Sequence, residues 1–424
     1  MPFHSLYYVH RQRKVPSLDT PKLRELQTVK LRAIIKHAYE NVAYYRKLFD
    51  SAGVKPADVV DLTDLTKIPL TTKSDLQNLA LDEVTAANMS IDKCKEMVIS
   101  GPSGQPLRIF FTPKDYGFLE MLWARGFLEN GLRLTDKRVS IEFQLPYTSW
   151  IQRLGIWRKD LLSVQYDPPS QVSIIKEMNP DALTGYPFDL QALAKAITAV
   201  DAKEIQPRLV FSLGSFLGSE PRRLIEEVFA TRIFDFYATG ELGCIAWECT
   251  NHAGYHINTD AFVLELIEGE RSVPLGEKGE IVCTALHSHA MPLIRYRTGD
   301  VGVFSDEPCP CGRGLPRMSY REGRANTFII TPTNRLVSPC WLVNILKVIP
   351  GIAQYKLVQK AKGQLLVKLK KGRDFSSETV NRIRDGLSSA LEGINIEVEV
   401  VDDMPKDSPG KVWSIVSELP EVIG

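Results

Sequence analysis

The stretch "RLVFSLGSFLGSEPRRLIEEVFATRIFDFYATGE", residues 208–241, carries the pattern that decides the fold. Two short runs rich in β-branched and aromatic residues, "RLVFSL" and "RIFDFY", stand on either side of the helical pattern "EPRRLIEEVF". Strand-like runs that alternate with helical patterns are typical of α/β folds, in which helices cover sheets. The stretch therefore predicts an α/β fold.

The same alternation continues on both sides, from about residue 96 to residue 325. Further runs of these kinds are "RIFF", "RVSIEF", "AFVLELI", "GEIVCTAL", "YGFLEMLWARGFLENG" and "DLQALAKAITAV". We therefore expect a large, multi-layer N-terminal domain over residues 1–325, with mixed β-sheets flanked by helices. Its first part, to about residue 95, is expected to be helical.

The helical start is predicted from apolar spacing. Over residues 20–50 apolar side chains recur at intervals of three and four after Pro21, which predicts helix. A segment punctuated by prolines follows, and either Thr72 or Ser74 is placed to cap the next helix.

The last hundred residues have a different pattern. In order, "QYKLVQK", "QLLVKLKKG", "SSETVNRIRDGLSSALEG" and "INIEVEVVDD" predict strand, strand, helix and strand. This is a small α+β unit that can fold separately, and we place it at residues 326–424. The polar segment "YREGRAN" before it is expected to be the exposed linker between two cores.

Composition excludes several classes of protein. The 424 residues carry 52 Lys and Arg against 51 Asp and Glu, so no net charge draws the chain to nucleic acid or to an anionic membrane. No segment approaches the roughly 20 apolar residues that span a bilayer, and the first residues have no signal-peptide core. We expect a cytoplasmic protein with no membrane partner. Seven cysteines in so long a chain favour thiols or a metal over disulfides.

A loop rich in glycine and serine, "ISGPSGQP" at residues 99–106, is either a phosphate site or a plain turn. Glycines free the backbone to turn its N–H groups toward an anion, and serine hydroxyls add donors. The loop nevertheless lacks the lysine of G-x-x-x-x-G-K-[ST] and does not match G-x-G-x-x-G. Alone, the loop favours a turn.

Four further stretches change this interpretation: "RIFDFYATGE" (232–241), "MPLIRYRTGDVGVF" (291–304), "YREGRANTFII" (320–330) and "MPKDSPGKVW" (404–413). Their order and spacing, together with "HAYENVAYYRKLF" and "IPLTTKSDL", resemble the adenylate-forming superfamily of acyl-CoA synthetases, and specifically its phenylacetate–CoA ligase branch. The resemblance runs over most of the chain. It implies an enzyme that joins a carboxylic acid to ATP, expels pyrophosphate and passes the acyl group from the acyl adenylate to coenzyme A.

The resemblance also implies a role for individual residues. Glu241 would hold Mg²⁺ and Lys411 would be the catalytic lysine of a mobile C-terminal domain, which turns about a hinge at Asn326. Tyr237 would stack on adenine and Asp300 would bind the ribose hydroxyls, although alone Asp300 is equally a turn cap. The full set expected to bind the nucleotide is Ser100, Gly101, Ser103, Gly104, Gly214, Ser215, Asp235, Phe236, Tyr237, Ala238, Thr239, Asp300 and Arg324.

The cysteines include a candidate metal site. "ECTNHAGYH" puts Cys249 before His256, and "PCPCGRG" puts Cys309 and Cys311 two apart, a set that can close a tetrahedral zinc site if the segments meet. The phenylacetate–CoA ligase branch has a similar arrangement. Four protein ligands leave no open position, so we expect a structural Zn²⁺. His252 is a second-ranked ligand, and the competing interpretation is buried or incidental thiols, which we prefer for Cys94, Cys244, Cys283 and Cys340.

The chain departs from the family pattern near the expected ATP and thiol sites. Relatives usually read Ser-Ser-Gly-Thr-Thr-Gly-Lys-Pro where this chain has Ile99 to Pro106, so Pro102 and Gln105 replace a hydroxyl and a lysine. Gly240 stands where relatives have Ser or Thr. The glycine-rich loop after the hinge reads "TPTNRLVSP", and Gly-Ala-Glu-Pro or Gly-Gly-Glu-Pro has become Gly214-Ser215-Phe216-Leu217.

These observations favour an acid–coenzyme A ligase that uses ATP and Mg²⁺. Tyr147, Tyr186 and Phe216 are candidates for the pocket of an aromatic or flat acid, although aromatics are also ordinary core residues. The alternatives are an adenylate-forming enzyme with an amine, carrier-protein thiol or hydroxyl acceptor, and a non-catalytic homologue. The family is often dimeric, so a homodimer is possible. No H-E-x-x-H, no G-x-S-x-G and no nucleic-acid module is present.

Overall fold

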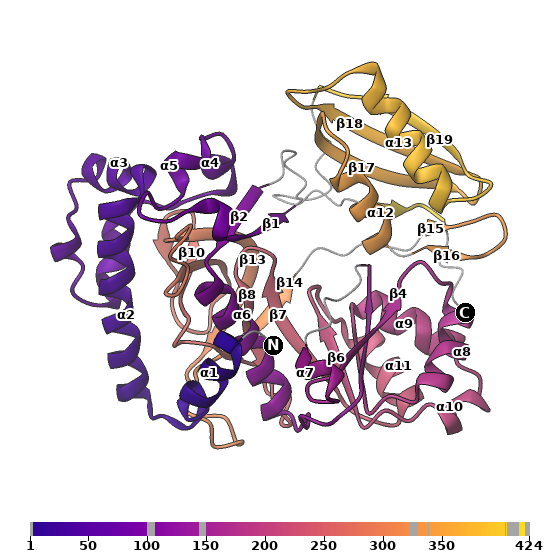
Figure 1. Cartoon of the computed structure of the whole chain (residues 1–424), viewed down its shortest axis with the longest axis horizontal. Coiled ribbons are helices and arrows are strands. Elements are labelled where there is room, and N and C mark those ends of the chain that lie inside the picture. Colours follow the sequence, from indigo (N-terminus) through magenta and orange to yellow (C-terminus); the bar gives the residue numbers. More distant parts are fainter. Residues whose placement is uncertain are drawn as a thin grey trace. The chain divides into compact units, whose positions relative to one another are not determined.

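The computed structural model describes residues 3–99, 107–143, 150–322, 329–337, 339–402, 404 and 415–419. These residues form two compact units, whose helices and strands are drawn in Figure 1. Unit 1 contains residues 3–99, 107–133 and 234–322, and unit 2 contains the other described residues.

The N-terminal helices of unit 1 follow the apolar spacing of the sequence. Asp19 caps α2, because its side chain accepts a hydrogen bond from the Lys22 amide at 3.0 Å. The helix predicted over residues 20–50 is two helices, because Val42 takes an extended conformation between them. The bounds are α1 Phe3–Gln12, α2 Thr20–Asn41, α3 Ala43–Ser51, α4 Lys73–Gln77, α5 Leu81–Val84 and α6 Pro113–Glu129.

Of the two candidate caps for the next helix, Thr72 is the one that caps α4. Its hydroxyl accepts a hydrogen bond from the Asp75 amide at 3.3 Å, and Asp75 in turn accepts from the Thr72 amide at 2.7 Å. This reciprocal pair fixes the start of α4 and therefore the position of Lys73, the first residue of that helix.

The strands of unit 1 form an antiparallel sheet in the order β11-β10-β12-β13-β14-β9-β8-β7 and a separate hairpin of β1 and β2. Their bounds are β1 Lys95–Ile99, β2 Leu107–Phe111, β7 Ile233–Thr239, β8 Gly243–Glu248, β9 Tyr255–Ile257, β10 Phe262–Glu268, β11 Arg271–Ser272, β12 Gly279–Ala285, β13 Tyr296–Ser305 and β14 Arg317–Glu322. The sheet thus brings residues far apart in the sequence onto neighbouring strands.

Helix α6 packs closely against this sheet at Gly126. A Cβ atom there would lie 2.8 Å from Cζ of Phe236 on β7 and 3.2 Å from Cγ of Trp247 on β8. Phe236 also stacks on Trp123 of α6, with ring centroids 5.9 Å apart. The helix backbone at Gly126 therefore packs directly on the rings of two strand residues, and the helix contributes no side chain at this point.

The first half of unit 2 is a parallel sheet in the order β4-β3-β5-β6 with its own helices. Parallel strands joined through helices are what the alternating pattern predicts. The bounds are β3 Arg138–Glu142, α7 Trp150–Arg153, β4 Lys159–Ser163, α8 Pro168–Met178, β5 Ala182–Gly185, α9 Pro187–Ala196, α10 Asp201–Glu204, β6 Leu209–Leu213 and α11 Ser219–Phe229. A core of buried aliphatic residues, including Ile141, Leu183 and Val210, holds these layers together.

The C-terminal part of unit 2 has the predicted strand, strand, helix and strand, with four further elements. The bounds are β15 Ile329–Ile330, β16 Leu336–Val337, α12 Pro339–Lys347, β17 Ile352–Ala361, β18 Gln364–Lys371, α13 Ser377–Ala390, β19 Asn395–Val400 and β20 Ile415–Ser417. The sheet order is β19-β18-β17-β20, and Leu357, Val367 and Ile383 lie in its separate core. The expected α/β fold class with a separate C-terminal α+β domain is therefore confirmed. The expected domain boundary at residue 325 lies outside the described residues and stays a prediction.

Among the described residues, no helix combines the length and the apolar character that crossing a membrane requires.

Candidate functional site

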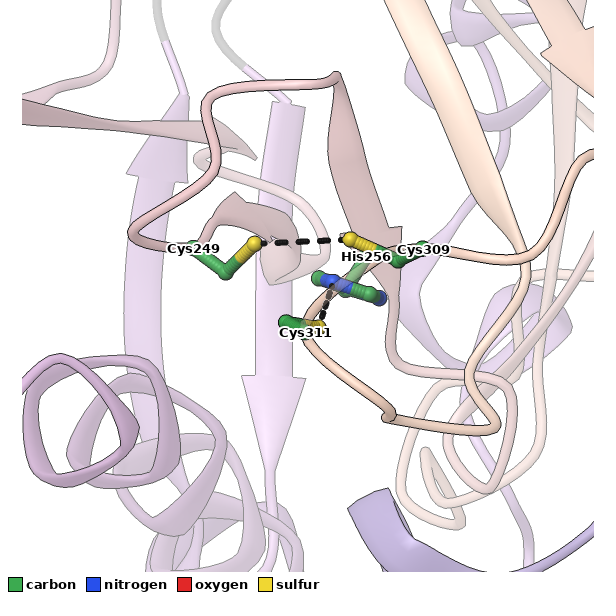
Figure 2. Close-up of side chains that lie close together, drawn as sticks. All are labelled: Cys249, His256, Cys309 and Cys311. Atoms are coloured by element: carbon green, nitrogen blue, oxygen red, sulfur yellow. Dashed lines mark hydrogen bonds between the residues drawn. The ribbon is translucent and has the colours of Figure 1, made fainter.

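Four predicted metal ligands come together in unit 1. Cys249 follows β8, His256 lies on β9, and Cys309 and Cys311 lie in the segment between β13 and β14 (Figure 2). One ligand atom from each residue lies within 4.8 Å of the others. We call these four residues the cysteine–histidine cluster. The sequence predicted this set on the condition that its two segments meet. The pairing of β8 with β9 and of β9 with β14 brings the two segments together.

His256 has the tautomer and charge of a metal ligand. Its Nδ1 donates to the Leu315 carbonyl oxygen at 3.1 Å, which leaves the Nε2 lone pair directed toward Cys311 Sγ at 3.3 Å. Burial lowers the pKa of His256 below its usual value, so the ring is neutral near pH 7. A neutral imidazole whose other nitrogen is fixed by a backbone carbonyl is the form that coordinates metals.

Two thiols of the cluster, Cys249 and Cys311, have altered pKa values. Cys249 Sγ lies 3.6 Å from Cys309 Sγ, and burial raises the pKa of Cys249 to about 12. Burial also raises the pKa of Cys311, but hydrogen bonds with the backbone and side chain of Arg313 and with Cys309 and Cys249 together outweigh it and lower that pKa below the usual value. Three close thiols cannot all ionise without a compensating cation. A bound metal ion would provide that compensation.

The second-ranked ligand, His252, lies outside the cluster. Its Nδ1 is 3.5 Å from Glu248 Oε2, and its ring stacks on Phe234 with centroids 5.3 Å apart. Cys94, Cys244 and Cys283 are free thiols outside the cluster as well.

A second group of predicted residues meets on β7 and β13 of the same unit. The Tyr237 hydroxyl donates to Asp300 Oδ2 at 3.1 Å. The Thr298 hydroxyl, 3.5 Å from the same phenol oxygen, accepts a hydrogen bond from the Asp300 amide at 3.2 Å. The residues predicted to bind adenine and ribose therefore touch each other.

Glu241 lies just after β7 and is held by two residues that the sequence analysis did not select. The Tyr296 hydroxyl donates to Glu241 Oε1 at 3.3 Å, and Lys73 Nζ lies 3.8 Å from the same oxygen. Lys73 also donates to the Ile99 carbonyl at 3.3 Å, where the 99–106 loop begins. Together, Tyr237, Glu241, Tyr296 and Asp300 are called the tyrosine–carboxylate group.

Further predicted nucleotide-binding residues lie on β7, where successive side chains face opposite sides of the sheet. Asp235 is buried on the same face as Tyr237, and its Oδ2 accepts a hydrogen bond from the Tyr255 hydroxyl at 2.6 Å. Phe236 faces the opposite side and packs in the core against α6. Ala238 pairs with Cys244 after a bulge, and the Thr239 hydroxyl accepts from the Leu242 amide at 3.2 Å in the turn before β8.

Tyr255 also connects the cysteine–histidine cluster with the tyrosine–carboxylate group. It stands next to His256 on β9, and because neighbouring strand residues point to opposite faces, the two side chains leave the strand in opposite directions. His256 enters the cysteine–histidine cluster, whereas Tyr255 bonds to Asp235, two residues before Tyr237. Strand β9 therefore links the cluster to the strand of the tyrosine–carboxylate group.

Gly240, one of the departures from the family pattern, lies against the side chain of Ile99. A Cβ atom on Gly240 would lie 2.5 Å from Ile99 Cδ1. The side chain of Ile99 thus occupies the space that a residue larger than glycine would need at position 240.

In unit 2, predicted residues follow β5 and β6. Gly214 has a φ of +74°, and a Cβ there would lie 2.9 Å from Cε1 of Tyr186. Glycine is therefore required both for the backbone conformation and for the close approach of the Tyr186 ring. Ser215 and Phe216 come next, and 37% of Phe216 is exposed. The parallel strands place these residues at the carboxyl edge of the sheet, where α/β proteins bind ligands.

The remaining predicted residues lie outside the described residues. They are Ser100, Gly101, Ser103, Gly104, Tyr147, Arg324, Asn326 and Lys411.

Comparison with known proteins places the chain in a family. Its residues 329–418 match the model of the CapK C-terminal domain. A phenylacetate-coenzyme A ligase of Pseudomonas putida is 32% identical over 335 residues, which are 73% of this chain and 72% of the relative. The corresponding ligase of Escherichia coli is 30% identical over 74% of each chain, and that of Thermus thermophilus is 28% identical over 84% of this chain and 82% of its own.

Among solved structures, a 2-hydroxyisobutyryl-CoA ligase in complex with 2-HIB-AMP and CoA superimposes with a TM-score of 0.67. The superposition covers 96% of this chain and 91% of that one at 18% identity, so it supports the fold. With the sequence identity and coverage above, the chain belongs to the phenylacetate-coenzyme A ligase family, a branch of the adenylate-forming acyl-CoA synthetases.

Proposed function

We propose that this protein is an AMP-forming acid–coenzyme A ligase that activates an organic acid, with an aromatic acid the first candidate. The observation that carries the proposal is the contact between Tyr237 and Asp300, with Glu241 nearby on the same strand–turn segment, in a chain whose relatives are phenylacetate-coenzyme A ligases. Adenylation needs a base-stacking ring, a ribose acceptor and a cation-binding carboxylate, and these three residue types meet there.

In the first half-reaction the acid's carboxylate oxygen attacks the α-phosphorus of ATP, and pyrophosphate leaves. We assign Tyr237 to adenine and Asp300 to the ribose hydroxyls, so that the α-phosphate is held in a fixed position relative to the acid. Lys411 would offset the charge that develops on the carboxylate and the α-phosphate. Ser100, Gly101, Ser103 and Gly104, with Arg324, would donate hydrogen bonds to the phosphates and the ribose.

Glu241 is the residue proposed to hold Mg²⁺. Its carboxylate is about nine-tenths buried and fixed by a tyrosine hydroxyl, and hard oxygen donors are what this cation prefers. When bound, Mg²⁺ neutralises charge on the phosphate oxygens. The residues of this chain contribute the position and orientation of the carboxylate.

For the cysteine–histidine cluster we propose one structural Zn²⁺. The donor set of three sulfurs and one neutral imidazole nitrogen, all close together and largely buried, fits a closed tetrahedral site. With four protein ligands no position is left for water or substrate. The ion would therefore fasten the β8–β9 turn to the segment before β14 and take no part in the chemistry.

In the second half-reaction the thiol of coenzyme A attacks the acyl carbonyl of the adenylate and AMP leaves. The small C-terminal domain, turning at Asn326, would withdraw Lys411 and open a path for the thiol. Tyr186 and Phe216, with Tyr147, are proposed to line the acid pocket. A homodimer is a further possibility, which the mass of the protein in solution would decide.

A second candidate is transfer to an amine, a carrier-protein thiol or a hydroxyl. It is favoured by the loop after the hinge, which is a hairpin of β15 and β16 whose Asn334 has a φ of +63°. Arg335 in this loop donates to the Gln165 carbonyl at 2.9 Å. A bulky, anchored loop where relatives have glycines would change the shape of a thiol path.

Pyrophosphate exchange with a panel of aromatic and aliphatic acids tests the proposed function. We expect exchange with at least one acid and, after addition of coenzyme A, a thioester detectable by mass spectrometry. An amide or an AMP ester in place of the thioester would establish the second candidate. Absence of exchange with every acid, combined with absence of ATP binding by calorimetry, would indicate a non-catalytic homologue.

A further inference from the structure

Tyr296 contacts the carboxylate that the proposed function assigns to the cation. Its hydroxyl donates to Glu241 Oε1 at 3.3 Å, and only 3% of Tyr296 and 9% of Glu241 are exposed. A hydrogen bond to a carboxylate in a largely buried setting is stronger and more directional than one in water. The rotation of the Glu241 carboxylate is therefore restricted.

The backbone around Tyr296 is fixed by the N-terminal part of the chain. The Thr71 amide donates to the Arg295 carbonyl at 2.9 Å, and the Arg297 amide donates to the Thr71 carbonyl at 2.9 Å. This parallel bridge holds the residues on both sides of Tyr296, and Thr71 itself is fully buried. The phenol therefore projects from a backbone that is held on two sides.

The same segment places a cation beside the carboxylate. Lys73, two residues after Thr71 and at the start of α4, has its Nζ 3.8 Å from Glu241 Oε1. Both contacts found between Glu241 and the described side chains therefore end on Oε1. Within the part of the chain that the structure describes, Oε2 makes no such contact, and it is therefore the oxygen that we assign to a divalent cation.

We infer that Tyr296 is a positioning residue that holds Glu241 through Oε1 so that Oε2 faces the Mg²⁺ of the nucleotide. The inference rests on the proposed function, in which Glu241 binds that cation. Tyr296 does not touch the reacting atoms. It lowers the cost of ordering the carboxylate when the cation binds.

The test is Tyr296→Phe, which removes the hydroxyl and retains the ring. We expect Mn²⁺, used as a paramagnetic substitute for Mg²⁺, to bind roughly tenfold more weakly to the variant saturated with a non-hydrolysable ATP analogue, since a hydrogen bond to a charged group contributes on this scale. Electron paramagnetic resonance measures free Mn²⁺ directly and needs no turnover. In pyrophosphate exchange, the Mg²⁺ concentration for half-maximal rate should rise by a similar factor, whereas thioester formation from supplied acyl adenylate should not change.

Tyr45→Phe is the matched control. Tyr45 is fully buried, and its hydroxyl accepts a hydrogen bond from the Ile294 amide at 3.0 Å, two residues before Tyr296. The control therefore loses a buried tyrosine hydrogen bond on the same segment without touching Glu241. It should lose stability and keep the wild-type affinity for Mn²⁺.

The possible outcomes separate this inference from the proposed function. If the wild type binds nucleotide and Mn²⁺ but exchanges no pyrophosphate, the proposed reaction fails while the positioning role of Tyr296 is still decided by Mn²⁺ affinity. Equal Mn²⁺ affinity of wild type and Tyr296→Phe would overturn the inference. A similar loss of Mn²⁺ affinity in Tyr45→Phe would also overturn it, because the effect would then be general loosening of the segment.

Discussion

The cysteine–histidine cluster and the tyrosine–carboxylate group lie in the same unit but are built in opposite ways. In the cluster, four ligand atoms lie within 4.8 Å of one another, so each ligand atom has the other members as neighbours. In the tyrosine–carboxylate group, each carboxylate accepts a hydrogen bond from a tyrosine hydroxyl, Asp300 from Tyr237 and Glu241 from Tyr296. The first arrangement is closed, as in structural metal sites, whereas the carboxylates of the second are proposed to bind the nucleotide and its cation.

The largest effect is expected from a substitution in the tyrosine–carboxylate group alone. Glu241→Gln keeps the size of the side chain and removes its charge, so we expect pyrophosphate exchange to fall roughly 100- to 1,000-fold, as when a single electrostatic contributor is removed. Zinc content and melting temperature should stay at wild-type values. Glu268→Gln, an exposed glutamate on β10, is the matched control. Loss of zinc in Glu241→Gln would show that the two regions are not separate.

The second-largest effect is expected from a substitution in the cysteine–histidine cluster. In Cys311→Ser we expect about one zinc per chain to be lost and the melting temperature to fall by at least about 5 °C, because metal binding energy is also folding energy. Elemental analysis and calorimetry on freshly purified protein measure both. Cys94→Ser, a partly exposed thiol outside the cluster, should change neither quantity. If the wild-type protein contained no zinc, the proposed structural Zn²⁺ would be ruled out.

Acid should weaken the fold even where zinc is retained. Burial lowers the pKa of His287 from 6.5 to about 4. Above pH 6.5 the imidazole is neutral in both states, but between pH 6.5 and 4 the unfolded chain takes up a proton that the folded chain does not. Stability is therefore lost as the pH falls, by up to about 3 kcal/mol.

Urea unfolding at pH 7.5, 6 and 5 with parallel zinc analysis measures this effect. His287→Gln should flatten the acid side of the stability profile, because glutamine does not titrate. Acid also releases metals from thiolates, so the cluster contributes a loss of its own. If wild type and His287→Gln lose stability equally and in step with zinc, the cluster alone explains the acid sensitivity.

The smallest effect tests the link between the regions. Tyr255→Phe removes the 2.6 Å hydrogen bond to Asp235 and leaves a buried carboxylate without that donor. We expect the free energy of unfolding to fall by about 1–3 kcal/mol and the Kd for ATP to rise about threefold at most, since Tyr237 is supported only indirectly. Zinc content should be unchanged. An effect on ATP binding as large as that of Glu241→Gln would make Tyr255 part of the site itself.

Local sequence patterns predicted the secondary-structure elements and the cysteine–histidine cluster. The strand–helix alternation and the strand, strand, helix, strand order of the C-terminal region follow from side-chain periodicity. The cysteine–histidine cluster could be predicted because its four ligands lie in two short segments of the sequence. The break at Val42 was missed because one extended residue does not disturb the apolar spacing of the helices on either side.

The contacts of Lys73 and Tyr296 with Glu241 could not be predicted in this way, because they depend on the pairing of Thr71 with β13. The same applies to the contact between Ile99 and Gly240, which are far apart in the sequence. The placement of Phe236 on the side opposite to Asp235 and Tyr237 had a usable signal, since alternate residues of a strand face opposite sides.

The close contact of α6 at Gly126 has a consequence for protein engineering. In an exposed helix, replacing an interior glycine with alanine stabilises by roughly 1 kcal/mol, which makes such positions standard choices for thermostabilisation. Here the added methyl group would press on the rings of Phe236 and Trp247. Phe236 precedes Tyr237 on β7, so an exchange that helix propensity alone would favour would shift the strand that carries residues proposed to bind the nucleotide. A design method that ranks substitutions by helix propensity would therefore choose, at residue 126, a change that displaces β7.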